Sequence, residues 1–170
     1  WESGHKQALA IEFRLGYLTT DHNDGMRKFR VVPRPLERGD PYGLDYAILK
    51  LERRIRGFDP LEVTVREVVS LDPLMVIGHP LGKVLSVSRG GCSAKERALN
   101  SDGNLMNHRC ATEKASSGSP IFDAGLSNLV ALHSASSTSS NHGVRMTKLL
   151  DVSPILQSVY SASVAAFRGP

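Results

Sequence analysis

The feature that most constrains the fold is a succession of short apolar segments separated by Gly, Pro, Asn and Asp, roughly every 8–12 residues. Segments this short between turn residues are typical of β-strands rather than helices. So many short strands predict an all-β sandwich or barrel. The predicted strands lie at 8–15, 29–32, 46–51, 74–78, 84–88, 105–108, 121–123 and 129–133.

Only the C-terminal part of the chain has a helical pattern. Between residues 147 and 160, apolar residues recur at a spacing close to 3.6. The sequence Asp-Val-Ser-Pro at 151–154 fits a helix start, because proline is tolerated in the first turn. We therefore expect one helix on the outside of the β-structure.

Composition excludes some classes of function. The chain has 170 residues, enough for one sizeable domain or two small lobes. Its net charge is +4, but the cations are scattered among acids, as in 52–56, so we predict a solvated surface rather than a nucleic-acid site. No apolar run approaches the ~20 residues that cross a bilayer. We expect binding to neither nucleic acid nor membranes.

Two cysteines, Cys92 and Cys110, lie in segments with strand character on either side of a polar stretch. The turn sequence Asn-Ser-Asp-Gly-Asn at 100–104 would close a hairpin and bring them together, which predicts a cross-strand disulfide. Two buried free thiols fit the same pattern. A disulfide would indicate an oxidising compartment, either secreted or periplasmic.

The segment Lys-Ala-Ser-Ser-Gly-Ser-Pro at 114–120 contains the strongest candidate for chemistry, Ser117. A tight turn of this kind presents a hydroxyl beside backbone N–H groups, and such groups can stabilise an oxyanion. An ordinary turn between two strands has the same composition. A nucleophilic serine also needs a base and an acid that orients the base. Asp45, at the start of an apolar strand, is the candidate acid, although a loop aspartate at a strand start is common.

Four segments in order carry a resemblance to a known family. They are Asp-Tyr-Ala-Ile-Leu-Lys-Leu at 45–51, Ile-Gly-His-Pro-Leu-Gly at 77–82, Cys-Ala-Thr-Glu-Lys-Ala-Ser-Ser-Gly-Ser-Pro-Ile-Phe at 110–122, and Val-Ala-Leu-His at 130–133. Together they resemble the trypsin-like serine peptidases of the chymotrypsin superfamily, in particular the bacterial branch that includes the glutamyl endopeptidases.

The resemblance implies a chymotrypsin-like double β-barrel with a C-terminal helix and the active site in the cleft between the barrels. Residues 1–60 would be the remnant of an N-terminal barrel that carries the triad Asp. Residues 61–170 would form the C-terminal barrel with the nucleophile and the helix. The implied protein is a monomer that hydrolyses polypeptides without a cofactor or metal.

The resemblance also implies roles for single residues. Ser117 would be the nucleophile, Asp45 the triad acid, and the N–H groups of Ala115 and Ser117 the oxyanion hole. Position 115 departs from the family, which usually has glycine there. If this position needs φ > 0, alanine costs on the order of 1 kcal/mol.

The general base is the larger departure. In the family the triad histidine precedes the acid, and only His5 and His22 precede Asp45 here. We expect His22 to be a solvent-facing residue of the turn at 21–25, while His5 lacks an apolar strand before it. The sequence therefore predicts a base upstream of Trp1, together with the first strands. His5 as the base, or a family member without a base, remain as alternatives.

Substrate recognition is also implied by position. Thr112 and His133 match family positions that hold the carboxylate of a substrate Glu side chain, and a hydroxyl with an imidazole suits that anion. A histidine that ends a core strand is the alternative for His133. We expect His79 to be a structural turn residue and His108 to lie on a strand surface.

Overall fold

The structure is a computed structural model that describes residues 10–20, 25–40, 43–58, 63–137 and 140–167. The described residues form twelve strands, one 3₁₀ turn and two helices. The strands are β1 (Ile11–Leu15), β2 (Arg27–Val31), β3 (Glu37–Arg38), β4 (Ala47–Ile48), β5 (Thr64–Val65), β6 (Leu74–Gly78), β7 (Ser86–Ser88), β8 (Ala94–Leu99), β9 (Leu105–His108), β10 (Pro120–Asp123), β11 (Asn128–Ser136) and β12 (Asn141–Arg145). The 3₁₀ turn η1 spans Pro80–Gly82, and the helices are α1 (Met146–Val152) and α2 (Pro154–Phe167).

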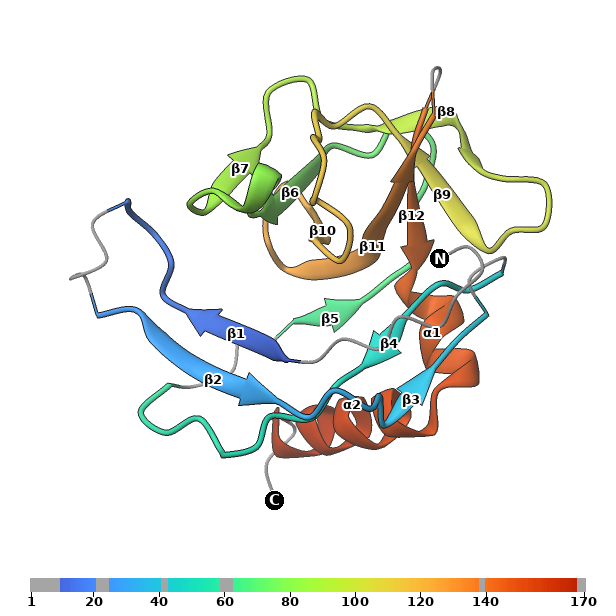
Figure 1. Cartoon of the computed structure of the whole chain (residues 1–170). Helices are drawn as coiled ribbons and strands as arrows, with labels where there is room; N and C mark the ends of the chain where they lie inside the picture. Colours follow the sequence, from blue (N-terminus) through green and yellow to red (C-terminus); the bar gives the residue numbers. More distant parts are fainter. Residues whose placement is uncertain (1–9, 21–24, 41–42, 59–62, 138–139, 168–170) are drawn as a thin grey trace, which may run out of the picture.

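The C-terminal strands form one large curled sheet. Its order is β7-β6-β10-β11-β12-β9-β8, and β5 adds a parallel pairing with β11. The sheet closes on itself, because a bridge between Pro73 and Ser93 joins the start of β6 to the start of β8. The Leu74 N–H also donates to the Cys92 carbonyl at 3.0 Å. Strands β6, β10, β11, β12, β9 and β8 therefore form a barrel (Figure 1).

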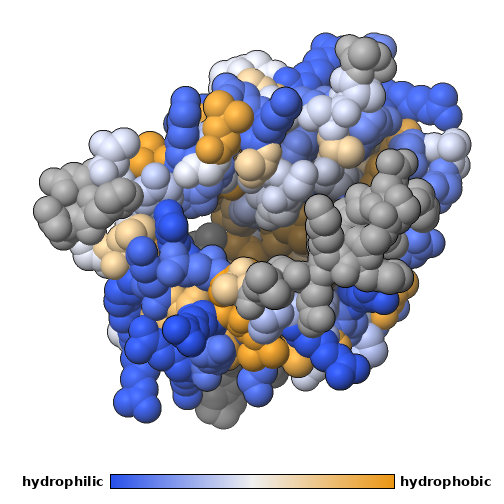
Figure 2. All heavy atoms as spheres, in the orientation of Figure 1, coloured by the Kyte–Doolittle hydropathy of each residue, from blue (hydrophilic) through white to orange (hydrophobic). Residues whose placement is uncertain are grey.

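The N-terminal strands form two smaller sheets, β1 with β2 and β3 with β4, each antiparallel. A bridge between Val31 and Leu51 joins β2 to the segment after β4. Figure 1 places these strands beneath the barrel, alongside α2. On the face drawn in Figure 2, the surface is hollowed between the two parts, and apolar residues gather around the hollow. The expected division of the chain at residue 60 stays a prediction.

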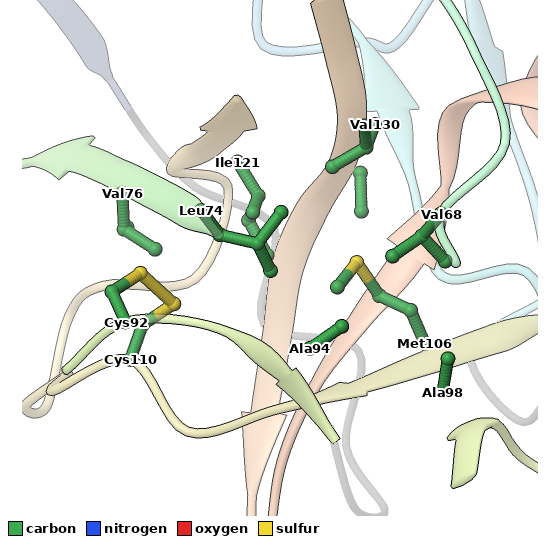
Figure 3. Close-up of a cluster of buried hydrophobic side chains, with 11 residues drawn as sticks. Val68, Leu74, Val76, Cys92, Ala94, Ala98, Met106, Cys110, Ile121 and Val130 are labelled. Carbon is green, nitrogen blue, oxygen red and sulfur yellow. A yellow bond between two sulfur atoms is a disulfide. The ribbon is translucent and has the colours of Figure 1, made fainter. Parts of the chain in front are cut away.

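The barrel is filled by a single cluster of buried apolar side chains (Figure 3). Strand alternation explains the cluster, because inward positions are apolar and the polar positions between them face solvent. Burial of each large aliphatic side chain stabilises the fold by about 1.5–3 kcal/mol. The cluster comprises Val68, Leu74, Val76, Cys92, Ala94, Ala98, Met106, Cys110, Ile121, Val130 and Ala131.

The predicted disulfide is present: Cys92 and Cys110 are bonded, with their Cα atoms 3.9 Å apart. The sequence suggested that both cysteines lie within strands, but neither does. Cys92 precedes β8 and Cys110 follows β9, so the bond ties together the open ends of the β8–β9 hairpin. This confirms the disulfide and corrects the position of both residues.

The predicted C-terminal helix is two helices, because the chain breaks at Ser153. Pro154 has no N–H to continue the hydrogen-bond pattern of α1, so α1 ends and α2 begins there. The Ser153 hydroxyl accepts the Leu156 N–H at 3.1 Å and caps α2. Side chains of α1 pack with Val144, and Tyr46 and other N-terminal residues pack against this second cluster.

A carboxylate from the N-terminal part also meets the start of α2. Glu37 in β3 accepts the Ile155 N–H at 3.4 Å and the Tyr46 hydroxyl at 2.7 Å. The hydrogen bond from the Ser153 hydroxyl, followed by that from Tyr46, lowers the pKa of Glu37. The N-terminal strands are thus attached to the C-terminal helix by an anion at a helix N-terminus.

Most predicted strands are present and four others were missed. The segments 74–78 and 105–108 match β6 and β9, while β4 covers only two residues of the predicted 46–51. The missed strands are β3, β5, β8 and β12. Part of the predicted strand 8–15 and most of the predicted turn at 21–25 lie outside the described residues.

Candidate functional site

The turn that carries Ser117 is built from local backbone hydrogen bonds between β9 and β10. The Ser116 N–H donates to the Glu113 carbonyl at 3.2 Å, and the Ser119 N–H donates to the Ser116 carbonyl at 3.0 Å. The Gly118 N–H reaches across to the His133 carbonyl in β11 at 2.7 Å. Gly118 has φ +89°, a conformation that glycine adopts without steric cost. The turn is thus fixed against the barrel.

Two N–H groups in this turn are unused. Within the described part of the chain, neither the Ala115 N–H nor the Ser117 N–H donates a hydrogen bond, and both residues are exposed. The Lys114 carbonyl accepts the Leu81 N–H at 2.8 Å. Because a trans peptide points its C=O and N–H in opposite directions, this bond directs the Ala115 N–H away from Leu81. Two free donors on one turn can stabilise a developing oxyanion.

Ala115 adopts φ +65°. Position 115 therefore has the left-handed backbone conformation in which alanine, unlike glycine, is strained. A non-glycine residue adopts it at a cost of about 1–2 kcal/mol. The backbone at position 115 is therefore left-handed although the residue is alanine.

The Ser117 side chain is exposed, and its hydroxyl donates to the Ser134 carbonyl in β11 at 2.9 Å. None of the four described histidines is hydrogen-bonded to it. Their partners lie elsewhere: the His79 ring bonds the Lys83 carbonyl, and the rings of His108, His133 and His142 bond groups of β9 or β11. His5 and His22 lie outside the described residues.

Asp45, the candidate acid, is exposed and lies just before β4. In the described part of the chain it forms no hydrogen bond or ion pair, so the structure does not join it to Ser117. The neighbouring Tyr46 is the anchored residue of this segment, through its bond to Glu37.

A cavity of about 310 Å³ lies directly beside the Ser117 turn. Its wall contains Thr112, Glu113, Ser116 and Ser119 from the turn. The remaining lining residues are Val76, Gly78, Pro80, Ser86, Ser88 and Ala111. The Thr112 hydroxyl is buried and has no hydrogen-bond partner among the described residues. His133 does not line this cavity, so the structure does not bring Thr112 and His133 together there.

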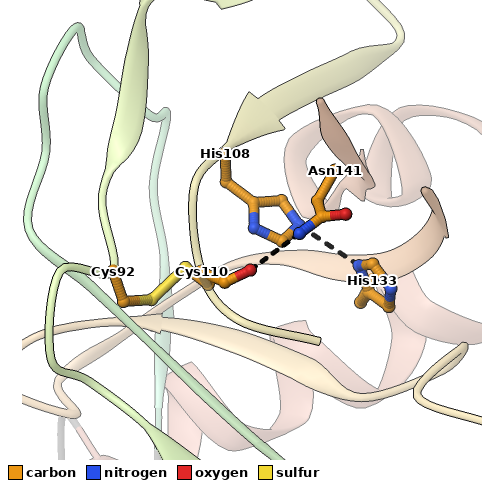
Figure 4. Close-up of a disulfide and its surroundings, with 5 residues drawn as sticks. All are labelled: Cys92, His108, Cys110, His133 and Asn141. Carbon is orange, nitrogen blue, oxygen red and sulfur yellow. Dashed lines mark hydrogen bonds between the residues drawn. A yellow bond between two sulfur atoms is a disulfide. The ribbon is translucent and has the colours of Figure 1, made fainter. Parts of the chain in front are cut away.

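His133 belongs to a buried imidazole pair (Figure 4). Its Nδ1 lies 3.1 Å from Nε2 of His108, and both side chains are almost fully buried, at 3% and 1% exposed. In the neutral pair one ring nitrogen donates and the other accepts. Beside this pair, the Asn141 side chain donates to the Cys110 carbonyl at 2.7 Å, next to the disulfide.

Burial lowers the pKa of both histidines. Desolvation, with smaller contributions from His133 and His142, lowers the pKa of His108 to about 4. Desolvation also lowers the pKa of His133, against a hydrogen bond to the backbone of His142 that raises it. Both rings are therefore neutral near pH 7 in the free protein.

The burial of His108 corrects the expectation that it lies on a strand surface. A signal for this was available in the sequence. Met106 and His108 are two residues apart in β9, and alternation puts them on the same face, which is the barrel interior.

Other kinds of site are not found in the described residues. No three His, Cys, Asp or Glu side chains there come together as ligands for a metal ion. No helix in that part of the chain is long and apolar enough to span a bilayer.

Comparisons with known proteins identify the family. A family model described as a trypsin-like peptidase domain matches residues 12–132, more than half of the chain. No curated protein sequence matches the chain.

Solved structures share the fold at low sequence identity. The inactive form of the Rv3671c protease has a TM-score of 0.55 and 17% identity, covering 76% of this chain and 70% of its own. The active form of the same protease, from M. tuberculosis, also has a TM-score of 0.55, with 16% identity, covering 74% of this chain and 57% of its own. These likenesses show a chymotrypsin-like protease fold.

Proposed function

Because the chain belongs to the trypsin-like peptidase domain family, we propose that it is a serine endopeptidase with Ser117 as its nucleophile. The observation that carries this proposal is the pair of unused N–H groups, on Ala115 and Ser117, in the same turn as an exposed hydroxyl. Because both residues are exposed and neither N–H has a protein partner in the described part of the chain, both donors are available to a substrate carbonyl oxygen.

In the proposed reaction, Ser117 Oγ attacks the carbonyl carbon of a peptide bond and loses its proton to a general base. The carbonyl oxygen becomes an oxyanion held by the two N–H groups. The C–N bond then breaks, the base returns the proton to the leaving amine, and water hydrolyses the acyl-enzyme. Before attack, the hydroxyl must leave the Ser134 carbonyl, to which it donates in the free protein.

The proposed reaction also needs a general base and an acid that orients it. Since the four described histidines are bonded elsewhere, the base is a histidine outside the described residues, of which His5 is one candidate. Asp45 is proposed to orient it. Its exposed side chain, free of partners in the described part of the chain, supports this assignment, because a triad acid has to be available to the imidazole.

A fluorophosphonate probe tests the proposal, because it reacts with activated serines. We expect a single adduct on Ser117, located by peptide mapping, that is absent from Ser117→Ala. Ser101→Ala is the matched control, since it removes an exposed hydroxyl from the β8–β9 turn, and its labelling should equal that of the parent. His5→Ala should abolish labelling if His5 is the base.

Absence of labelling in the folded protein as the cell makes it would contradict the proposal. A catalytically inactive homologue that binds peptides in the same cleft would then be the better account. The strained Ala115 and the engaged Ser117 hydroxyl are the observations that favour that second candidate.

We further propose a preference for acidic side chains at the residue before the cleaved bond. The unpartnered Thr112 hydroxyl in the wall of the cavity beside Ser117 supports it. The His133 imidazole is buried and does not line that cavity in the free protein, so it would have to turn toward the bound side chain. A bound carboxylate would raise the pKa of His133 and so gain a cationic partner, with His108 behind it as a hydrogen-bond partner.

Matched peptide substrates test this preference. Glu and Gln differ only in charge at nearly equal shape, so their kcat/KM ratio isolates the charge. We expect at least tenfold in favour of Glu for the parent, since a charged hydrogen bond is worth about 1.5–3 kcal/mol. His133→Gln should reduce the ratio to near one, and an unchanged ratio would contradict the assignment.

The Cys92–Cys110 disulfide supports a secreted or periplasmic location for the protein. Disulfides persist in oxidising compartments and are rare in the cytosol.

A further inference from the structure

Two non-glycine residues with left-handed backbones are joined by one hydrogen bond. Leu81 in η1 has φ +56°, and Ala115 has φ +65°. The Leu81 N–H donates to the carbonyl of Lys114, the residue directly before Ala115, at 2.8 Å. The Leu81 side chain is 49% exposed, so the contact depends on its backbone. In the described part of the chain, no other hydrogen bond involves the C=O or N–H of the Lys114–Ala115 peptide.

The η1 turn is closed by two backbone hydrogen bonds, from the Gly82 N–H to the His79 carbonyl and from the Lys83 N–H to the Pro80 carbonyl, each at 3.0 Å. The His79 side chain adds a further contact across the turn. The imidazole Nδ1 lies 2.9 Å from the Lys83 carbonyl, so the ring spans the turn from its first residue to its last. The ring also stacks on Tyr17, with centroids 5.6 Å apart and planes 15° from parallel. The Leu85 N–H donates to the Tyr17 carbonyl at 3.1 Å, which keeps the N-terminal segment against η1.

We propose that His79 is a positioning residue for the oxyanion hole, acting through the Leu81 N–H on the Lys114–Ala115 peptide. This inference rests on the proposed function of Ser117. The physical reason is that two opposing free energies, a backbone strain and a hydrogen bond, are of similar size. A left-handed alanine costs about as much as one hydrogen bond contributes, so the Leu81 bond decides the orientation of this peptide.

Loss of that bond lets the peptide rotate. Rotation takes Ala115 out of the left-handed region, relieves its strain, and replaces the N–H in the oxyanion hole with the Lys114 carbonyl. A carbonyl oxygen there repels the oxyanion, while Ser117 and its own N–H stay in place. His79 thus affects the reaction without touching the substrate.

The mechanism predicts a specific suppressor. His79→Ala should lower the second-order rate of fluorophosphonate labelling by about tenfold or more, because one of two oxyanion donors is lost. Ala115→Gly removes the strain that favours rotation. The double variant His79→Ala/Ala115→Gly should therefore recover to within about threefold of Ala115→Gly alone. A merely structural role for His79 gives no such rescue.

Lys83→Ala is the matched control in η1. It removes an exposed side chain but keeps the backbone carbonyl that His79 bonds, so its labelling rate should equal that of the parent. The midpoint of thermal unfolding, measured for every variant, separates loss of fold from loss of positioning.

Amide hydrogen exchange supplies a readout that does not depend on activity. The Leu81 amide should be protected in the parent and should exchange at least tenfold faster in His79→Ala. Equal exchange, or equal labelling of His79→Ala and a labelled parent, would overturn the inference. If the parent is not labelled, the proposed function of Ser117 is overturned. Faster exchange of the Leu81 amide in His79→Ala would in that case still support the coupling between His79 and the Leu81–Lys114 hydrogen bond.

Discussion

At the scale of single residues, the turn around Ser117 depends on backbone conformations that most side chains disfavour. Ala115 and Gly118 both have positive φ, on either side of Ser117. A Cβ at Gly118 would meet no atom within 4 Å, so substitution there adds backbone strain without a clash. A substitution at Gly118 therefore tests the backbone conformation of the turn without disturbing its packing.

We predict that Gly118→Ala lowers the free energy of unfolding by about 1 kcal/mol and also slows the labelling of Ser117. Gly57→Ala is the matched control, because Gly57 has φ +73° and equally open space. It should show a similar loss in urea unfolding with unchanged labelling. Equal labelling of both variants would show that the shape of this turn does not control the reactivity of Ser117.

The buried His108 predicts a pH dependence. Its pKa falls from 6.5 to about 4 on folding, so the unfolded chain binds more protons between these values. Stability is therefore complete above pH 6.5 and declines as pH falls toward 4, by ~3 kcal/mol from this residue.

The measurement is urea unfolding between pH 6.5 and 5, where histidines titrate more than carboxylates do. His108→Leu removes the titrating ring from the barrel and should flatten the slope in this interval. An unchanged slope would assign the pH dependence to other groups, such as His133, whose pKa is also lowered by burial.

At the scale of elements, the break between α1 and α2 shows how one residue can divide a helical pattern. The apolar spacing at 147–160 indicates a single helix, and it continues across the break. Pro154 ends the backbone pattern, and the buried Ser153 caps the second helix. Periodicity reports the buried face of a segment and is not sensitive to a one-residue interruption.

Ser153→Ala should cost about 1 kcal/mol of stability, because the Leu156 N–H loses its cap. Ser158→Ala, at an exposed position inside α2, provides the comparison. It should be neutral or slightly stabilising, since alanine is the better helix former. Thermal unfolding of both variants tests this, and equal effects would show that the cap at Ser153 contributes nothing.

The missed strands have physical reasons. The β8 sequence Ala-Lys-Glu-Arg-Ala-Leu is rich in helix formers, and only its place beside β9 makes it a strand. In β12 the buried position 143 is a glycine, so the strand lacks one apolar side chain of the expected pattern. A Cβ at Gly143 would lie 2.9 Å from the Ile121 side chain and 3.1 Å from the Leu132 carbonyl oxygen, so a larger residue there would force its neighbours to shift. Tertiary packing determines both strands, and local composition does not report it.

At the scale of the whole molecule, the disulfide joins the ends of one hairpin where the barrel closes. The cysteines are 18 residues apart, and a loop of that size implies a stabilisation of about 3 kcal/mol from reduced chain entropy. We expect Cys92→Ala/Cys110→Ala to lose about this much in urea unfolding. Reductant should destabilise the parent and leave the double variant unchanged; equal sensitivity would contradict the prediction.

The sequence predicted the all-β class, the disulfide and the family through ordered local motifs. It predicted the location of the Ser117 turn but could not place Asp45, Thr112 and His133 relative to it. Those relations depend on how the N-terminal strands and the barrel pack, which no local pattern encodes. The His108–His133 pair was missed for a related reason, since it joins residues 25 positions apart.

The central claim is peptide hydrolysis through an acyl-enzyme on Ser117. The most direct test is intact mass spectrometry of the protein, quenched in acid during turnover of a peptide ester. We expect an adduct with the mass of the acyl group, mapped to Ser117 and absent from Ser117→Ala, which should not cleave the substrate. Cleavage by Ser117→Ala at the parent's rate, or turnover with the acyl group on another residue, would contradict it.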